Sequence, residues 1–238
     1  MPKSLVVAIH QPNFFPWMGY FDKIARSDAF IFFDDVQFPK KGGSWSNRVK
    51  LLVGEEAKWV TAPITRDYHG TREILEMSFI SKTPWREKLL KTIHHNYQRH
   101  PYYSETMELV STLLLNPEPN IAEYNIHAIT TITLRLGLDT AKLKRSSGLV
   151  HKGTSNELLC SLTRALDGDT YMCGGGADGY QDETVFCEQG VTLKFQNYSP
   201  SVYPQWRQGN FIAGLSIIDA AMNLGWSALG QSFHSSSC

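Results

Sequence analysis

The stretch from residue 5 to residue 35 constrains the fold more than any other part of this sequence. Residues 5–9, LVVAI, form an apolar run rich in β-branched side chains, which is typical of a strand buried in a parallel sheet. The next ten residues, HQPNFFPWMG, contain two prolines and a glycine and are predicted to be a loop. Residues 20–26 have helical spacing, and residues 29–33 form a second apolar run. This order predicts two parallel strands joined by a right-handed crossover.

The rest of the chain returns to the same alternation after a hairpin and a group of helices. The predicted hairpin strands are residues 45–53 and 58–62, and three predicted helices fill most of residues 84–137. Further strands are predicted at residues 141–144, 170–173 and 191–197, and further helices at residues 155–166, 182–189 and 215–224. The order predicts an α/β fold: a Rossmann-like, doubly wound, mainly parallel sheet with an inserted helical subdomain.

The length of 238 residues suits one domain with a sizeable core. We predict a single α/β domain over residues 1–226, with the helical insertion at about residues 84–137. Residues 227–238 end in SSSC and are predicted to be a weakly ordered tail.

The charge balance argues against two classes of partner. Lys and Arg together number 23, as do Asp and Glu, so the formal net charge at pH 7 is zero. Neither a nucleic acid nor an anionic membrane surface is therefore expected as a partner. No stretch approaches the ~20 apolar residues of a membrane span, and the N-terminus lacks the apolar core of a signal peptide. These features predict a cytoplasmic protein.

The cysteines, at positions 160, 173, 187 and 238, contain no CxxC pair. Neither a disulfide framework nor a metal site is expected from this spacing. Cys173 stands before three glycines, where a nucleophile is conceivable, but a buried structural cysteine is the favoured interpretation.

Polar side chains collect where the first predicted strand ends. His10, Gln11 and Asn13 follow that strand, and ligands of open α/β sheets bind beyond the carboxyl ends of the strands. Gln11 and Asn13, together with Tyr20 after the loop, are candidate substrate-binding residues. Histidine can donate or accept a hydrogen bond, and it can gain or lose a proton near neutral pH. These properties make His10 a candidate catalytic residue. The alternative is that His10 bonds a neighbouring carbonyl and that the prolines only shape a turn.

A second polar group, DDVQFPKKGGSWSNR, begins where the next predicted strand ends. Asp34 can orient a histidine, Asn47 can bond an amide or a sugar hydroxyl, and Lys41 and Arg48 suit phosphate or carboxylate. The alternative is a solvated hairpin with surface charges.

Two later segments complete the candidate site. Gly174 and Gly175 follow a predicted strand and would let a ligand approach the backbone, although the pattern matches no phosphate-binding motif. The segment FQNYSPSVYPQW carries Gln196, Tyr198 and Gln205, whose aromatic faces and hydrogen-bonding ends suit a sugar or nucleoside. The alternative is a surface loop packed by its own aromatics. The histidines at positions 94, 95 and 100 are expected on a helix surface.

Five segments resemble the WbqC-like family, in its order and over nearly the whole chain. They are IHQPNFFPWMGYFDKI, DDVQFPKKGGSWSNRVKL, YMCGGGADGYQDETVF, VTLKFQNYSPSVYPQ and LSIIDAAMNLG. The resemblance favours as site residues His10, Gln11, Pro12, Gly19, Asp34, Lys41, Asn47, Arg48, Tyr180, Gln196, Tyr198 and Gln205. The chain departs from the family pattern at the extra glycines Gly42 and Gly43 and at Cys173, where a smaller polar residue is expected.

The resemblance implies an enzyme of bacterial O-antigen and lipopolysaccharide biosynthesis. The implied reaction is transfer of an aminoacyl or acyl group, glycine in particular, from an activated acyl donor to the amine of a nucleotide-linked amino sugar. His10 would be the base, oriented by Asp34, and Asn47 with backbone N–H groups near Gly174 would stabilise the oxyanion. Lys41 and Arg48 would hold the phosphates.

A more distant resemblance links PWMGY, at positions 16–20, to the HxGH turn of nucleotidylyltransferases. Trp17 and Tyr20 stand where that turn has histidines, so its chemistry is not preserved and the likeness concerns the fold. It implies an alternative, a nucleotide-binding or adenylating enzyme that uses ATP and Mg²⁺. A third alternative is a non-catalytic binding protein of the same pathway.

Overall fold

The computed structural model describes residues 4–40, 43–174, 181–206 and 209–235. Within these residues, five strands form a sheet in the order β5-β2-β1-β6-β7, and every pairing is parallel. The strands are β1 (Val6–His10), β2 (Ala29–Phe32), β5 (Leu143–Arg145), β6 (Thr170–Cys173) and β7 (Thr192–Phe195). The predicted α/β fold with a doubly wound, parallel sheet is therefore confirmed.

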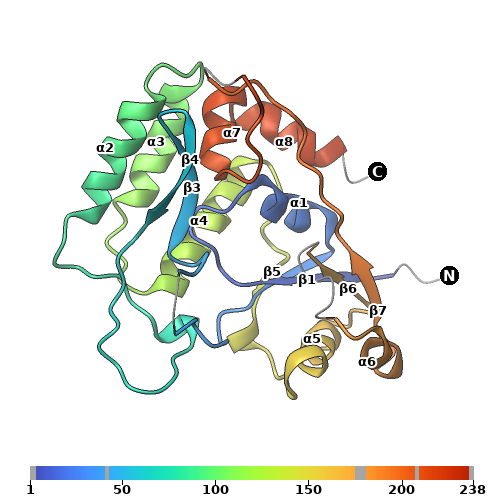
Figure 1. The fold of residues 1–238 in the computed structure, drawn as a ribbon. Coiled ribbons are helices and arrows are strands. Elements are labelled where there is room, and N and C mark those ends of the chain that lie inside the picture. Colours follow the sequence, from blue (N-terminus) through green and yellow to red (C-terminus); the bar gives the residue numbers. More distant parts are fainter. Residues whose placement is uncertain (1–3, 41–42, 175–180, 207–208, 236–238) are drawn as a thin grey trace.

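Helices cover both faces of the sheet (Figure 1). One face carries α5 (Ser155–Arg164) and α6 (Glu183–Glu188). On the other side lie α1 (Met18–Arg26) and α4 (Ile121–Arg135), and α7 (Ile217–Leu224) and α8 (Trp226–Ser235) lie farther from the sheet, with α8 in contact with α1. Successive strand residues alternate between the two faces, as the two-residue period of a strand requires. Thus Ala8 joins the larger hydrophobic cluster, whereas its neighbours Val7 and Ile9 join the smaller one under α5.

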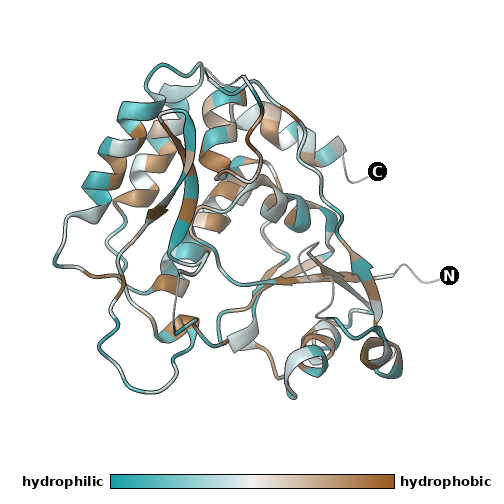
Figure 2. Ribbon diagram, in the orientation of Figure 1, coloured by the Kyte–Doolittle hydropathy of each residue, from teal (hydrophilic) through white to brown (hydrophobic). Residues whose placement is uncertain are grey.

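A hairpin and two helices stand beside the sheet. The antiparallel strands are β3 (Arg48–Val53) and β4 (Glu56–Thr61), and the helices are α2 (Trp85–Tyr97) and α3 (Tyr103–Leu114). Two short 3-10 turns, η1 (Ile74–Glu76) and η2 (Ser146–Gly148), complete the elements. Figure 2 shows β1 brown along most of its length, whereas the outer helix α2 alternates between teal and brown, as an amphipathic helix does.

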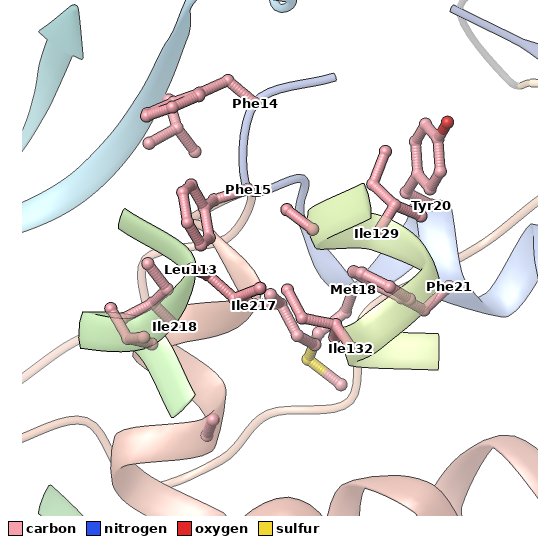
Figure 3. Close-up of a cluster of buried hydrophobic side chains, with 14 of the residues drawn as sticks. Phe14, Phe15, Met18, Tyr20, Phe21, Leu113, Ile129, Ile132, Ile217 and Ile218 are labelled. Atoms are coloured by element: carbon pink, nitrogen blue, oxygen red, sulfur yellow. The ribbon is translucent and has the colours of Figure 1, made fainter. Parts of the chain in front are cut away.

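The loop between β1 and α1 is part of the hydrophobic core. Phe14 and Phe15 are buried, and Figure 3 shows Phe15 close to Leu113 of α3 and Ile217 of α7. The Phe14 ring stacks on that of Tyr124 in α4, with centroids 5.9 Å apart. The Asn125 Nδ2 donates to the Pro12 carbonyl at 2.9 Å, and the Ser216 hydroxyl donates to the Phe15 carbonyl at 2.7 Å. The middle of this loop is therefore enclosed, whereas His10 and Trp17, at its two ends, line a pocket.

The C-terminal segment differs from the sequence prediction. A weakly ordered tail was expected from residue 227, but α8 extends from Trp226 to Ser235. The helix is held because its apolar residues Leu229 and Phe233 are buried in the larger hydrophobic cluster. Spacing of four residues places both side chains on the same face of the helix.

Candidate functional site

The candidate site lies where the sheet changes its direction of winding. From β1 the chain first adds β2 on one side, and β6 is later added on the other side. The carboxyl ends of such neighbouring strands open a crevice, which is the usual ligand position in doubly wound folds. A pocket of about 350 Å³ lies there, lined by His10, Trp17, Gly19, Tyr20, Lys23, Gly174, Gln196, Asn197 and Tyr198.

Three sheet strands and one helix supply the lining. His10 is the last residue of β1, Gly174 directly follows β6, and Gln196 directly follows β7. Helix α1 contributes Tyr20 and Lys23, which are three residues apart and therefore lie on one face.

His10 is held as a neutral imidazole. Its Nδ1 lies 3.1 Å from the Gln11 carbonyl oxygen, which only accepts, so Nδ1 carries the proton and Nε2 is the basic nitrogen. Burial lowers the pKa of His10 to about 3, and the positive charge of Lys23 contributes to the shift. The imidazole can therefore exchange hydrogen bonds with a ligand at neutral pH, but it is a weak base.

Lys23 is the most unusual side chain of the pocket. It is 3% exposed, and burial lowers its pKa to about 8. Its Nζ faces Gly174, since a Cβ built on that glycine would lie 3.4 Å from it. An electrostatic interaction with Cys173 acts in the opposite direction and raises the pKa of Lys23, but burial is the larger effect. A lysine in this state can accept a proton, which makes Lys23 a candidate catalytic residue.

Lys23 was not among the predicted site residues, although a signal for it was present in the sequence. Lys23 follows Tyr20, a predicted site residue, by three positions in a predicted helix. Helical spacing alone would have placed the two side chains on the same face.

Gln196 and Tyr20 organise the pocket through backbone carbonyls. The Gln196 Nε2 donates to the Gly19 carbonyl at 2.7 Å and to Asp22 at 2.8 Å, which ties the end of β7 to α1. The Tyr20 hydroxyl donates to the Gln11 carbonyl at 3.0 Å. Trp17 and Tyr198 form an aromatic wall, with ring centroids 5.3 Å apart.

Asp34 does not orient His10, contrary to the predicted arrangement. Its carboxylate instead accepts hydrogen bonds from Arg145 Nε at 2.8 Å and from the Ser147 hydroxyl at 2.9 Å, and Ser146 also bonds to it. Burial alone would raise the pKa of Asp34, but these hydrogen bonds outweigh it and hold the pKa below its ordinary value. Asp34 therefore joins β2 to β5 and η2.

Three other predicted residues serve internal contacts away from the pocket. Asn47 accepts from the Ser44 N–H and donates to the Ala62 carbonyl, so its amide is used inside the hairpin region. Gln205 bonds both backbone groups of Ile212. The Arg48 guanidinium lies 4.2 Å from the centre of the Trp59 ring, on the hairpin.

The remaining predicted residues divide into two groups. Asn13 is buried within the β1–α1 loop and does not line the pocket, and Gln11 contributes its carbonyl to the contacts of His10 and Tyr20. Lys41, Gly175 and Tyr180 lie outside the described residues.

A serine, an aspartate and a histidine also meet beside Asp34, a group that the sequence analysis missed. The Ser146 hydroxyl bonds Asp35, whose other oxygen lies 2.8 Å from His151 Nε2. The carboxylate stands between the hydroxyl and the imidazole, whereas nucleophilic catalysis by serine needs direct serine–histidine contact. This cluster is therefore a structural network.

The described residues lack two kinds of feature. No group of three or more His, Cys, Asp or Glu in them could hold a metal ion. None of their helices combines the length and the apolar character needed to cross a bilayer.

Comparison with known proteins identifies the family. The sequence profile of the WbqC-like protein family matches residues 11–231. The chain belongs to the WbqC-like protein family. This WbqC-like chain is also 29% identical over 222 residues to an uncharacterized protein of Mycobacterium tuberculosis (strain ATCC 25618 / H37Rv), Rv1507c, covering 92% of this chain and 94% of that protein. No solved structure matches the WbqC-like chain.

Proposed function

We propose that this WbqC-like chain is an enzyme that transfers an aminoacyl or acyl group, glycine in particular, to the amine of a nucleotide-linked amino sugar. The proposed setting is O-antigen and related surface-polysaccharide biosynthesis in the cytoplasm. The proposed reaction rests on one observation: the buried amine of Lys23, with a pKa of about 8, faces a pocket at the carboxyl ends of β1, β6 and β7. The family resemblance supports the pathway.

The chemistry needs a proton acceptor matched to the acceptor amine. The ammonium of an amino acid or amino sugar must lose a proton before its nitrogen can attack a carbonyl carbon. A base whose pKa is close to that of an α-amino group, ~8, accepts this proton at little cost. The proton passes to Lys23 Nζ, the nitrogen forms the new C–N bond, and the donor's leaving group departs with the electron pair of the broken bond.

His10 takes a different role from the one implied by the family resemblance. With its pKa lowered to about 3, it is a poorer base than Lys23 in the same pocket. Its unprotonated Nε2 can accept a hydrogen bond from the acceptor amine and so aim the nitrogen lone pair. We therefore assign His10 as a positioning residue and Lys23 as the base.

The walls of the pocket suit the rest of the substrate. The aromatic pair Trp17 and Tyr198 offers apolar ring faces to a sugar or a base. Helix α1 begins at the pocket with no acidic residue in its first turn, which favours a phosphate at its N-terminus.

Incubation with candidate substrates tests the proposal. Purified protein is mixed with a panel of nucleotide-linked amino sugars that carry a free amine, and with glycine supplied as a thioester or as an adenylate. The expected product is the sugar nucleotide heavier by one glycyl group, detected by mass spectrometry. Lys23→Met should lower the rate by about 100-fold or more, the range of general-base catalysis. Lys88→Met, at an exposed site on α2, should leave the rate unchanged.

Two outcomes would count against the proposal. Undiminished product formation by Lys23→Met would refute the assignment of the base. Absence of product with every donor and acceptor would refute acyl transfer itself.

A second candidate, nucleotidyl transfer from ATP with Mg²⁺, is favoured by the same uncapped N-terminus of α1 beside the pocket. It predicts pyrophosphate release in the presence of a sugar phosphate, whereas acyl transfer from a thioester predicts none. A non-catalytic member of the pathway would bind the sugar nucleotide without forming either product.

A further inference from the structure

Lys23 and Lys142 both lie in protected surroundings, but their amines face different groups. Burial lowers the pKa of both side chains. The Lys142 Nζ donates to the Ala25 carbonyl at 3.3 Å and to the Ser27 carbonyl at 2.8 Å. Lys23 instead lines the pocket at the carboxyl ends of the sheet strands. Backbone carbonyls therefore occupy the amine of Lys142, whereas the amine of Lys23 is presented to a cavity.

A glycine leaves space beside the Lys23 amine. A Cβ built on Gly174 would lie 3.4 Å from Lys23 Nζ, so a longer side chain at this position would fill the space next to the nitrogen. The cavity volume of about 350 Å³ lies within the range of small-ligand sites, ~300–1,000 Å³. A small molecule in the pocket can therefore reach Nζ.

The charges around the pocket favour an anionic ligand. Among the described residues that line it, none is acidic, and Lys23 supplies a positive charge when it is protonated. The Asp22 carboxylate is adjacent in sequence, but it pairs with Arg26 at 3.2 Å and accepts a hydrogen bond from Gln196 at 2.8 Å. A carboxylate bound in the pocket is therefore attracted by Lys23 and meets no acidic side chain in the described lining.

Asn197 offers hydrogen-bond donors to such a carboxylate. It lines the pocket directly after Gln196, which is fixed by its bond to the Gly19 carbonyl. Its backbone φ is 47°, in the left-handed region that asparagine adopts more readily than most residues. The Asn197 side chain is exposed, and its amide carries two N–H groups that can bond a carboxylate oxygen.

We propose that this pocket binds a 2-oxo acid, such as glyoxylate or pyruvate, and that Lys23 Nζ forms an imine with its carbonyl carbon. Desolvated lysines in ligand pockets are suited to this reaction. The amine lone pair forms the C–N bond, and the electrons of the C=O π bond pass to oxygen. That oxygen then leaves as water with the two protons of the amine, and a C=N bond remains. The step needs no oxidant or reductant.

Imine formation goes beyond the acyl transfer proposed above and does not require it. It needs only the pocket and the amine, and it uses the same nitrogen that accepts the proton during transfer. Since an imine nitrogen of Lys23 can no longer serve as that base, a bound 2-oxo acid should also inhibit glycyl transfer.

Reductive trapping of the full-length protein tests the proposal. The protein is incubated near neutral pH with glyoxylate and sodium cyanoborohydride, which reduces an imine to a stable amine, and its peptides are mapped by mass spectrometry. Lys23 should gain a carboxymethyl group at least about tenfold faster than Lys142 or the exposed Lys88. The physical reason is that its unprotonated fraction near pH 7 is about two orders of magnitude above that of an ordinary lysine.

Two variants and a second probe separate a binding site from simple amine reactivity. The rate at Lys23 should saturate with glyoxylate but rise linearly with acetaldehyde, which has no carboxylate. Asn197→Gly, which keeps a residue suited to positive φ, should slow trapping by glyoxylate about tenfold and by acetaldehyde less. Lys142→Met is the matched control and should leave trapping at Lys23 unchanged, because Lys142 lies outside the pocket.

Modification spread evenly over the lysines, or trapping at Lys23 that does not saturate with glyoxylate, would overturn the proposal. These outcomes are distinct from failure of the proposed function. A protein that traps glyoxylate at Lys23 and transfers no glycyl group would refute acyl transfer and leave the 2-oxo acid site intact.

Discussion

The charge of Lys23 acts directly on His10, because the two side chains face the same pocket at the end of β1. Burial is the larger cause of the lowered pKa of His10, and the Lys23 ammonium adds to it. Burial lowers the pKa of Lys23 to about 8 as well. The pocket therefore disfavours positive charge on both groups: His10 is neutral at pH 7, and Lys23 loses its proton at a lower pH than an ordinary lysine.

The proposed role of Lys23 gives the reaction a defined pH dependence. The rate should rise as pH passes through about 8, where the Lys23 amine loses its proton, and should then level off. Lys23→Arg should abolish both the activity and its rise with pH, because a guanidinium does not deprotonate in proteins. The measurement is kcat/KM for glycyl transfer as a function of pH. A pH profile retained in Lys23→Arg would show that another group titrates.

The same lysine should lower the stability of the fold. Its folded pKa, about 8, lies below the ordinary 10.5, so the folded state binds the proton less tightly than the unfolded state. Lys23 therefore destabilises the folded state below pH 8, and the free energy of unfolding rises as the pH increases from 8 to 10.5. Lys23→Met should therefore raise the free energy of unfolding at pH 7 by up to about 3 kcal/mol. Urea denaturation at two pH values measures this, and the gain should shrink at high pH.

His10 should make the fold sensitive to acid. Its pKa is about 3 in the folded state against 6.5 ordinarily, so stability is lost as pH falls from 6.5 towards 3. At pH ~4.5 the loss from this residue should be about 2–3 kcal/mol. His10→Gln should remove this loss, whereas His127→Gln, exposed on α4, should not. Equal acid sensitivity of His10→Gln and the unchanged protein would contradict the prediction.

The parts of the fold that could be predicted are those indicated by patterns of neighbouring residues in the sequence. The central strands β1 and β2 are apolar runs followed by polar residues, so their existence and their parallel pairing could be predicted. The edge that holds the pocket followed from the same argument, because the carboxyl ends of parallel strands meet at one edge. In the structure, His10, Gly174 and Gln196 lie at that edge and line the pocket.

The parts that the sequence did not predict depend on partners distant in the chain. The β1–α1 loop is buried because Asn125 and Ser216, more than a hundred residues away, bond its carbonyls. Asn47 and Gln205 had side chains suited to a ligand, but backbone groups of the same region take up their amides. No local pattern distinguishes an amide that bonds a substrate from one that bonds a carbonyl of the protein.

Substitution of Asp34 tests whether its buried carboxylate stabilises the fold by joining β2 to β5 and η2. Asp34→Asn removes the charge that holds Arg145, Ser146 and Ser147, and should lower the free energy of unfolding by about 2–4 kcal/mol. Glu123→Gln is the control, because Glu123 pairs with the same arginine but is exposed, and should cost less than about 1 kcal/mol. Thermal and urea denaturation measure both. Similar losses for the two variants would contradict the importance of the buried carboxylate.

The docking of α8 depends on a glycine in the middle of that helix. A Cβ on Gly230 would overlap the Leu136 carbonyl oxygen and lie 3.1 Å from its carbonyl carbon, at the end of α4. Because backbone cannot move aside as a flexible side chain does, Gly230→Ala should displace α8 and cost about 1–3 kcal/mol, despite the better helix propensity of alanine. Gly148→Ala is the control, since nothing lies within 4 Å of a Cβ there. Hydrogen exchange should show faster exchange at α8 amides in Gly230→Ala alone, and unchanged protection would mean that α4 and α8 do not pack as closely as this contact requires.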